Sequence, residues 1–354
     1  FRHAEEQEGQ GLGWLVLRAG RAAAPYLLRL QQWDAAGWML ERVLYRDGSP
    51  GTVAALLPLL RRVADAATGT EQELDHAGSL AWALARVRPG EAETRFRDLV
   101  DRAAGRGRYD VATAAAGELV SLLRDGGRLA EALVLAEQMR GYTRRAGLGP
   151  WTQIADEVQR LQILRLQGHD EQVLAAVDAL RETMAGLAEQ GDADERVVPW
   201  NVRESVLNTG VFAARGLGRW EEALAFNAEA ADSERRRGAS RLDQARTRFN
   251  DYGPLLRLDR LGEARVMLLD CRQVYEDAHA LAGLGKVLTA LADVEGRLGR
   301  TGSAVRLEQD ALRLKYAAGD PDDVAVSHFN LATYQQRAGQ DAGVVAHRLA
   351  CALI

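Results

Sequence analysis

The sequence predicts an all-α fold, a right-handed α-solenoid of stacked antiparallel helix hairpins. Ala, Leu, Arg and Glu dominate a chain of 354 residues that has only 8 prolines, and these four residue types favour the helical backbone. Runs of β-branched residues bounded by turn residues, the usual strand signal, are absent from the sequence. The third observation is a phrase that recurs about every 40 residues, which is typical of helical repeat proteins.

The repeated phrase is a turn residue followed, five positions later, by a small apolar residue. Gly usually occupies the turn, as in Gly218 before Ala223, while Gln31 and Asp259 take its place in two copies. From Ala92 onward, the spacings between successive small residues are 40, 41, 50, 41, 40 and 40. These small residues, which we call the anchors, are Ala36, Ala92, Ala132, Val173, Ala223, Ala264, Ala304 and Val344.

The predicted elements follow in order. Residues 11–31 and 33–45 form a first hairpin, 50–67 an additional helix, and 71–86 restart the repeat. We therefore divide the chain into an irregular part, residues 1–89, and six regular hairpins, residues 90–354, within one continuous solenoid. The chain begins at Phe1 without a Met and ends on the apolar phrase LACALI, whereas repeat arrays normally end in a polar helix. These ends lead us to expect a fragment of a longer protein.

The best-preserved hairpin comprises residues 203–216 and 220–235, whose apolar residues recur at helical spacing. Gly218 supplies the left-handed residue that ends the first helix, and Ala223 lets the two backbones approach closely. The longer spacing between Val173 and Ala223 predicts a long loop at residues 189–199, whose acidic sequence EQGDADERVVP suits an exposed excursion.

The turn phrases resemble tetratricopeptide repeats. In that family the first helix of a hairpin carries Asn-Leu-Gly near its middle, a Gly forms the turn, and an Ala lies early in the second helix. The segment Phe329-Asn330-Leu331-Ala332, with Gly339 and Val344, follows this pattern, and Phe249-Asn250-Asp251-Tyr252 follows it more loosely. The match is good over residues 90–354 and poor before them.

The period exceeds the 34 residues usual for the family, so we expect longer helices, as in kinesin light chains and bacterial signal-sensing regulators. The resemblance implies a superhelix whose concave face, made mainly by the first helix of each hairpin (helix A), binds peptides or proteins. It also implies the sensor or interaction region of a larger bacterial regulatory protein, in which the repeats follow an NTPase or protease-like module.

The net charge and the cysteines restrict the possible partners and the cellular compartment of the protein. The net charge of -5 argues against binding of nucleic acid through its phosphates. Cys271 and Cys351 form neither a disulfide framework nor a metal-binding spacing. We expect a cytoplasmic protein without a metal or cofactor, since no apolar run is long enough for a membrane span and no signal peptide precedes the repeats.

An arginine recurs in the last turn of helix A in seven of eight predicted hairpins. One interpretation is a cation at each helix C-terminus, worth about 0.3–1 kcal/mol through the helix dipole, or paired with the Glu that begins the next helix. The other is a track of guanidinium groups that binds carboxylates or a phosphorylated, acidic partner. This arginine ladder comprises Arg29, Arg124, Arg165, Arg215, Arg257, Arg297 and Arg337, and Arg86 misses its position by one residue.

Two asparagines and two tryptophans are further candidates. Asn250 and Asn330 occupy the helix A position that binds a ligand backbone in carboxylate clamps of the family, but the Lys pair of such clamps is missing, and a structural role is the alternative. Trp151 and Trp200 each follow a Pro at a predicted helix start, where we expect packing into the core.

The sequence contains no convergent set of catalytic groups, so we expect a binding protein and not an enzyme. One hypothesis is a scaffold that binds a protein or peptide along the helix A face. The predicted binding residues from residue 90 onward are Arg124, Arg165, Arg215, Asn250, Arg257, Arg297, Asn330 and Arg337. The alternative is a sensor that holds a small molecule or peptide signal inside the superhelix, in a pocket with clustered aromatic and polar residues.

Overall fold

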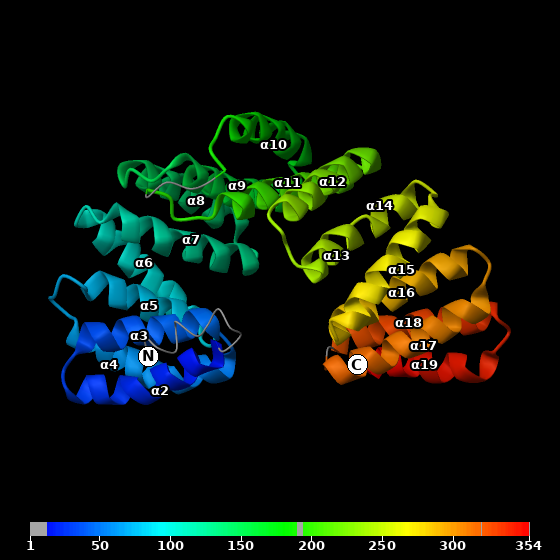
Figure 1. Ribbon diagram of the computed structural model, residues 1–354, viewed down its shortest axis with the longest axis horizontal. Coiled ribbons are helices and arrows are strands. Elements are labelled where there is room, and N and C mark those ends of the chain that lie inside the picture. The colour runs from blue at the N-terminus through cyan, green and yellow to red at the C-terminus, as the bar shows by residue number, and fades with distance from the viewer. Residues whose placement is uncertain (1–12, 190–193, 320, 354) are drawn as a thin grey trace. The chain divides into compact units, whose positions relative to one another are not determined.

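The computed structural model describes residues 13–189, 194–319 and 321–353, and within these ranges it contains helices and no strand (Figure 1). The all-α class is confirmed for this part of the chain. Residues 1–12, with which the predicted irregular part begins, lie outside the described residues.

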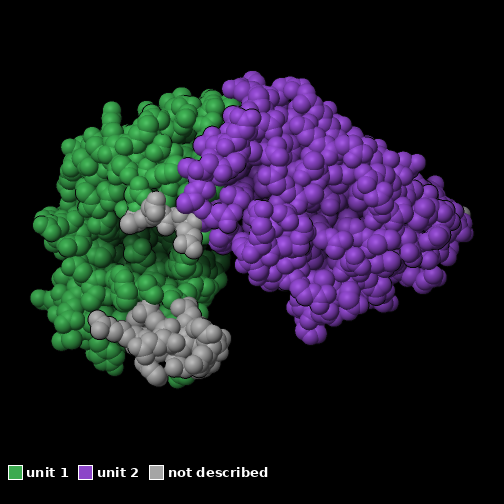
Figure 2. Space-filling model, turned by 45° about the horizontal axis from the view of Figure 1, so that its top comes forward, with its two compact units in different colours: residues 1–167, 190–198 green, residues 168–189, 199–354 purple. Residues whose placement is uncertain are grey.

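The chain divides into two compact units, coloured separately in Figure 2. Unit 1 consists of Phe1–Gln167 and Gln190–Val198, and unit 2 of Gly168–Glu189 and Pro199–Ile354. The predicted division at residue 90 stays a prediction.

The described helices of unit 1 lie in chain order, each packed against the next. They are α2 (Gly13–Arg29), α3 (Trp33–Arg46), α4 (Pro50–Ala66), α5 (Glu73–Ala85), α6 (Pro89–Gly105), α7 (Tyr109–Asp125), α8 (Leu129–Arg145) and α9 (Pro150–Leu166).

Unit 2 is also built of successive helices. Its described helices are α10 (Asp170–Ala185), α11 (Pro199–Gly216), α12 (Trp220–Arg236), α13 (Arg241–Phe249), α14 (Tyr252–Arg257), α15 (Leu261–Asp277), α16 (Leu281–Arg297), α17 (Thr301–Ala318), α18 (Pro321–Arg337) and α19 (Asp341–Leu353).

The predicted repeat is confirmed by burial and by backbone geometry. Every anchor is buried, with Val344 the most exposed at 7%. The turn residues before the anchors have positive φ at Gly218 (73°) and also at Gln31 (58°) and Asp259 (57°), where no Gly is present. Helices such as α7 and α8 have 17 residues each, which accounts for a period longer than that of the usual family.

One helix A is broken in two. The helix is interrupted between α13 and α14. Asn250 therefore caps the end of α13 and does not lie in the middle of a helix. Pro254 explains the break, because it has no N–H to donate to the carbonyl of Asn250. Asn227 of α12 stabilises the gap by donating to the Thr247 carbonyl (2.8 Å) and to the Asp251 carboxylate (2.7 Å).

Each unit has a hydrophobic core of its own. In unit 1, Leu40, Leu84 and Leu119 belong to one continuous cluster of buried side chains. In unit 2, Leu268 belongs to a larger cluster and Leu331 to a smaller one. None of the described helices is both long enough and apolar enough to span a membrane.

Candidate ligand site in unit 1

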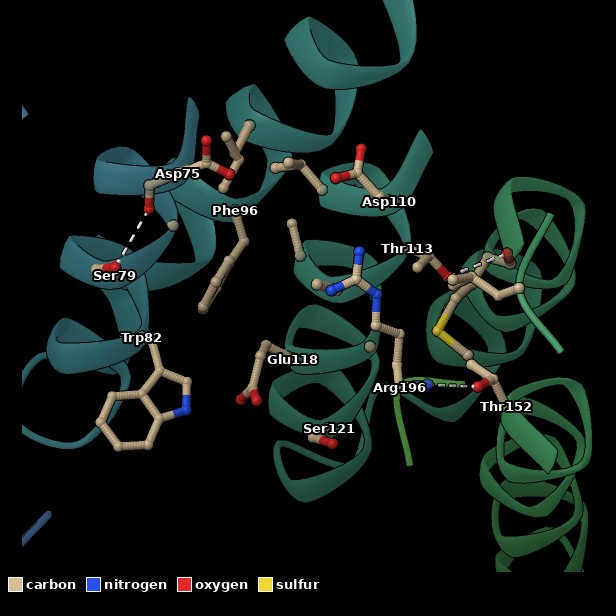
Figure 3. Close-up of a pocket in the computed structure, with 18 of the residues that line it drawn as sticks. Asp75, Ser79, Trp82, Phe96, Asp110, Thr113, Glu118, Ser121, Thr152 and Arg196 are labelled. Atoms are coloured by element: carbon tan, nitrogen blue, oxygen red, sulfur yellow. Dashed lines mark hydrogen bonds between the residues drawn. The ribbon is translucent and has the colours of Figure 1, made fainter. Parts of the chain in front are cut away.

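Unit 1 contains a cavity of about 920 Å³ (Figure 3). Most of its lining comes from α5, α7 and α9, which are helices A of three successive hairpins. The floor is apolar and includes Leu74, Phe96, Leu99 and Met139. The polar lining side chains are Glu41, Asp75, Ser79, Asp110, Thr113, Glu118, Ser121, Thr152, Asp156, Gln159 and Arg196, together with Tyr45 and Trp82.

Small residues on one face of α7 make room for the cavity. Ala114, Gly117 and Ser121 recur at helical spacing beside Glu118 and all line it. The Ala114 side chain is exposed. Ala155 of α9 and Gly78 of α5 line the same space, so little side-chain volume fills the gap between these helices A.

Arg108 neutralises two of the lining carboxylates in part. It lies at the N-terminus of α7 and pairs with Asp75 (3.1 Å) and Asp110 (3.0 Å). Its hydrogen bond holds the pKa of Asp110 below the usual value. Asp110 therefore stays ionised near neutral pH, and Asp75 and Asp110 share one cation.

Glu118 lies at the junction of the cavity and a smaller hollow of about 350 Å³. Burial raises the pKa of its carboxyl group, against the opposing effects of the Arg86 charge and of a hydrogen bond from the Trp82 indole. The Arg86 guanidinium itself rests over the Trp82 ring, 4.0 Å from the centroid. Figure 3 shows Trp82 and Glu118 extending from neighbouring helices.

Asp156 of α9 also lines the cavity and is buried, with 7% of its surface exposed. It accepts a hydrogen bond from the Thr143 hydroxyl (2.5 Å), which is also 2.5 Å from the Thr113 hydroxyl. Burial raises the pKa of Asp156 to about 6, although its hydrogen bond with Thr143 and the charges of nearby arginines act in the opposite direction.

Residues 194–198, which we call the strap, close one side of the cavity. The Glu195 carboxylate accepts hydrogen bonds from the backbone N–H groups of Trp151 (2.8 Å) and Thr152 (2.7 Å) at the start of α9. The Arg196 N–H donates to the Thr152 hydroxyl (3.0 Å), and the Arg196 side chain reaches into the cavity (Figure 3). The described part of the loop predicted at residues 189–199 is thus anchored to unit 1, although Asp194, Arg196 and Val198 are exposed as expected.

The arginine ladder lies in the last turns of the helices A, as predicted, but none of its members lines the cavity. Arg124 donates to the Gln162 side chain (2.8 Å), and Arg297 to Asp293 (3.1 Å). The guanidinium groups of Arg215 and Arg257 lie over aromatic rings, 5.7 Å and 5.8 Å from their centroids. The same last-turn position is occupied by Arg29, Arg165 and Arg337. Whether the ladder binds anions or only caps helices stays a prediction.

The two candidate asparagines lie in unit 2, at half-buried positions. Asn250 caps α13, and the Asn330 side chain hydrogen-bonds the buried carboxylate of Glu308.

Of the two tryptophans expected in the core, Trp151 is buried at 2% exposure. Trp200, in contrast, is 40% exposed, and its ring lies under the Arg237 guanidinium at 3.9 Å.

A second series of arginines, not recognised from the sequence, begins the second helix of several hairpins. Arg128 pairs with Glu131 of its own helix and with Glu93 of α6. Arg260 repeats the arrangement with Glu263 and Glu221. These pairs make a contact with the Glu at the start of the second helix, which one interpretation of the sequence gave to the ladder.

The cavity does not coincide with the arginine ladder, so the arginine pattern does not predict it. Its signal is the spacing of Ala114, Gly117, Glu118 and Ser121, small residues and one carboxylate on a single face of α7. The contribution of Arg196 has no comparable signal, since the strap reaches the cavity only through tertiary contacts.

No known protein family model matches the chain, and no curated protein sequence matches it. Among solved structures, the apo form of the quorum sensor NprR from B. thuringiensis is similar at TM-score 0.52 and 12% identity, covering 99% of this chain and 94% of that one. Aspartyl phosphate phosphatase F from Bacillus subtilis is similar at TM-score 0.50 and 11% identity, covering 85% and 89%.

A third similar structure is a signal transduction ATPase with numerous domains from Pyrococcus horikoshii, PH0952, which has a tetratricopeptide repeat sensor. Its TM-score is 0.50 at 12% identity, and the match covers 98% of this chain and 51% of that one. At such identities the likeness concerns the fold. The chain has the fold of tetratricopeptide-like helical repeat proteins.

Proposed function

We propose that the chain is a non-catalytic binding module that holds a peptide in the cavity of unit 1. The observation that carries the proposal is the cavity itself. Its volume of about 920 Å³ falls in the range of ligand pockets, and it combines an apolar floor with a few converging polar groups.

The position of the cavity supports the same function. Its walls are the helices A, the elements that the family resemblance assigns to peptide binding. The aromatic residues Tyr45, Trp82 and Phe96 lie with polar groups on adjacent hairpins, as expected of a sensor with its ligand inside the repeats. NprR is a quorum sensor, and the repeats of PH0952 are a sensor.

The proposal includes a regulatory role in the cytoplasm of a bacterium. This setting rests on the family resemblance and on the free cysteines Cys271 and Cys351, which suit a reducing compartment.

An occluding substitution tests the function. Ala114→Phe should fill the cavity with an aromatic ring while the fold tolerates it, because this side chain is exposed toward the cavity. We expect hexapeptides selected by the wild-type chain from a random library to bind the variant at least about tenfold more weakly, with an unchanged melting temperature.

Ala54→Phe is the matched control, since Ala54 is exposed on α4 outside the lining. This variant should bind as the wild type does. Selection of no peptide by the wild type, or equal binding by Ala114→Phe and wild type, would contradict the proposed function.

A further inference from the structure

The lining of the cavity carries more acidic than basic side chains. Five lining side chains are carboxylates, Glu41, Asp75, Asp110, Glu118 and Asp156, whereas Arg196 is the one basic residue among the described lining. Arg108, just outside the lining, forms ion pairs with two of the five carboxylates, Asp75 and Asp110. Of the other arginines outside the lining, Arg86 acts on Glu118, and Arg140 and Arg144 act on Asp156.

A second observation is an acceptor that the protein leaves unused. The Gln159 side-chain oxygen is buried and accepts no hydrogen bond from the described residues. Gln159 lines the cavity and lies against Gly117, the residue that precedes Glu118 on α7. A buried acceptor without a donor is unfavourable by about 1–3 kcal/mol, and a ligand donor would relieve this.

Glu118 is the carboxylate best placed to attract a cation. It is half-buried, it accepts a hydrogen bond from the Trp82 indole, and the nearby Arg86 guanidinium is stacked on the indole ring. A carboxylate partly removed from water and without a close ion-pair partner gains more from a charged donor than from a neutral one.

We propose that the peptide bound in the unit 1 cavity carries a basic side chain, which forms an ion pair with Glu118 and supplies N–H donors to the lining acceptors. The inference rests on the proposed function, and it assigns the cavity a ligand opposite in charge to the acidic partner expected for the arginine ladder. Arginine and lysine provide several donors on one cationic group, as this lining requires.

The test is binding of hexapeptide pools to the full chain, each pool carrying one fixed residue among random neighbours. The fixed residue is Arg, Lys, citrulline, Asp or Glu. Citrulline has the shape of arginine without its charge, so it separates charge from shape. We expect the Arg and Lys pools to bind about tenfold more tightly than the citrulline, Asp and Glu pools.

Glu118→Gln should remove this preference while leaving binding of the citrulline pool nearly unchanged. Glu118→Asp keeps the charge and should retain a preference for the basic pools. Glu182→Gln, on the exposed surface of α10, is the matched control and should behave as wild type. Helical circular dichroism checks the folding of each variant; if Glu118→Gln fails to fold, the wild-type comparison with citrulline and the Asp variant still decide.

The outcomes separate the two proposals. Tightest binding of the Asp, Glu or citrulline pools, or a basic preference that survives in Glu118→Gln, would overturn the inference about charge and leave the peptide-binding function standing. Absence of binding by every pool would refute the proposed function, and the inference with it.

Discussion

Asp156 is a carboxyl group that the fold buries beside the cavity. Burial raises its pKa from 3.8 to about 6. The folded protein therefore holds a proton on Asp156 at pH values where the unfolded chain has lost it. As the pH rises from about 4 to above 6, ionisation of this group lowers the free energy of unfolding, by about 3 kcal/mol at most.

Asp156→Asn should abolish this contribution, because an amide of the same shape does not ionise and its oxygen still accepts from Thr143. The free energy of unfolding of the variant minus that of the wild type should increase between pH 4.5 and 7.5, by about 2 kcal/mol. Denaturant titrations at four pH values in this range measure it.

The control for this pH dependence is Asp101→Asn, at an exposed aspartate of α6. Its stability difference from the wild type should change little over the same range. A difference that stays constant for Asp156→Asn as well would show that burial does not shift this carboxyl group.

The residues that pack in the core were predictable from the sequence, whereas the residues that line the unit 1 cavity were not. The anchors were found because a small residue at a fixed distance from a turn is a local pattern, and each of them is buried. Glu118 and Gln159 lie 41 residues apart on α7 and α9, and their shared cavity depends on three-dimensional packing. A single Glu does not stand out in a chain with 50 acidic residues.

At the scale of elements, the start of α9 depends on the strap. The cap residue Gly149 has no side chain to accept from the first N–H groups of the helix. Glu195, 44 residues beyond Trp151, supplies a carboxylate there, where the helix dipole favours negative charge. This long-range cap also fixes Arg196 and Val197 as a wall of the cavity.

Gly149→Ala should displace the Glu195 carboxylate from the start of α9. The added Cβ would collide with the Glu195 carboxylate, whereas the backbone of Gly149 (φ −69°, ψ 173°) accepts alanine readily. We expect faster hydrogen exchange at the amides of Trp151 and Thr152, the two N–H groups that Glu195 caps, measured by NMR or mass spectrometry.

Gly90→Ala is the matched control, since Gly90 also lies beside a proline at a helix start but has open space around it. This variant should exchange as the wild type does. Unchanged protection of Trp151 and Thr152 in Gly149→Ala would mean that the strap does not hold the helix start.

The helices were largely predictable from the sequence because their signals are local. Segment 50–67 was expected and is α4 (Pro50–Ala66). The break between α13 and α14 required weighing Pro254 against a strong repeat pattern. The contact between the strap and α9 was not predictable, because the sequence of an acidic loop does not indicate which distant helix it will cap.

At the scale of the whole molecule, the packing is short-ranged. Substantial contacts between helices join partners one or two positions apart in chain order. In such a repeat protein, stability is roughly a sum of local terms, and a chain with separate cores need not unfold in one step. Damage to one core should therefore stay within its own unit.

A matched pair of core substitutions tests this locality. Leu119 of α7 and Leu268 of α15 are 1% and 0% exposed and belong to the cores of units 1 and 2. Either Leu→Ala change removes the same atoms and should lower the stability of its unit by about 2–5 kcal/mol. Native-state hydrogen exchange should then accelerate in α6–α8 for Leu119→Ala, and in α15 and α16 for Leu268→Ala. Acceleration of the same helices by both variants would instead require one cooperative core, because only a shared unfolding step transmits the loss of a buried side chain to helices that it does not contact.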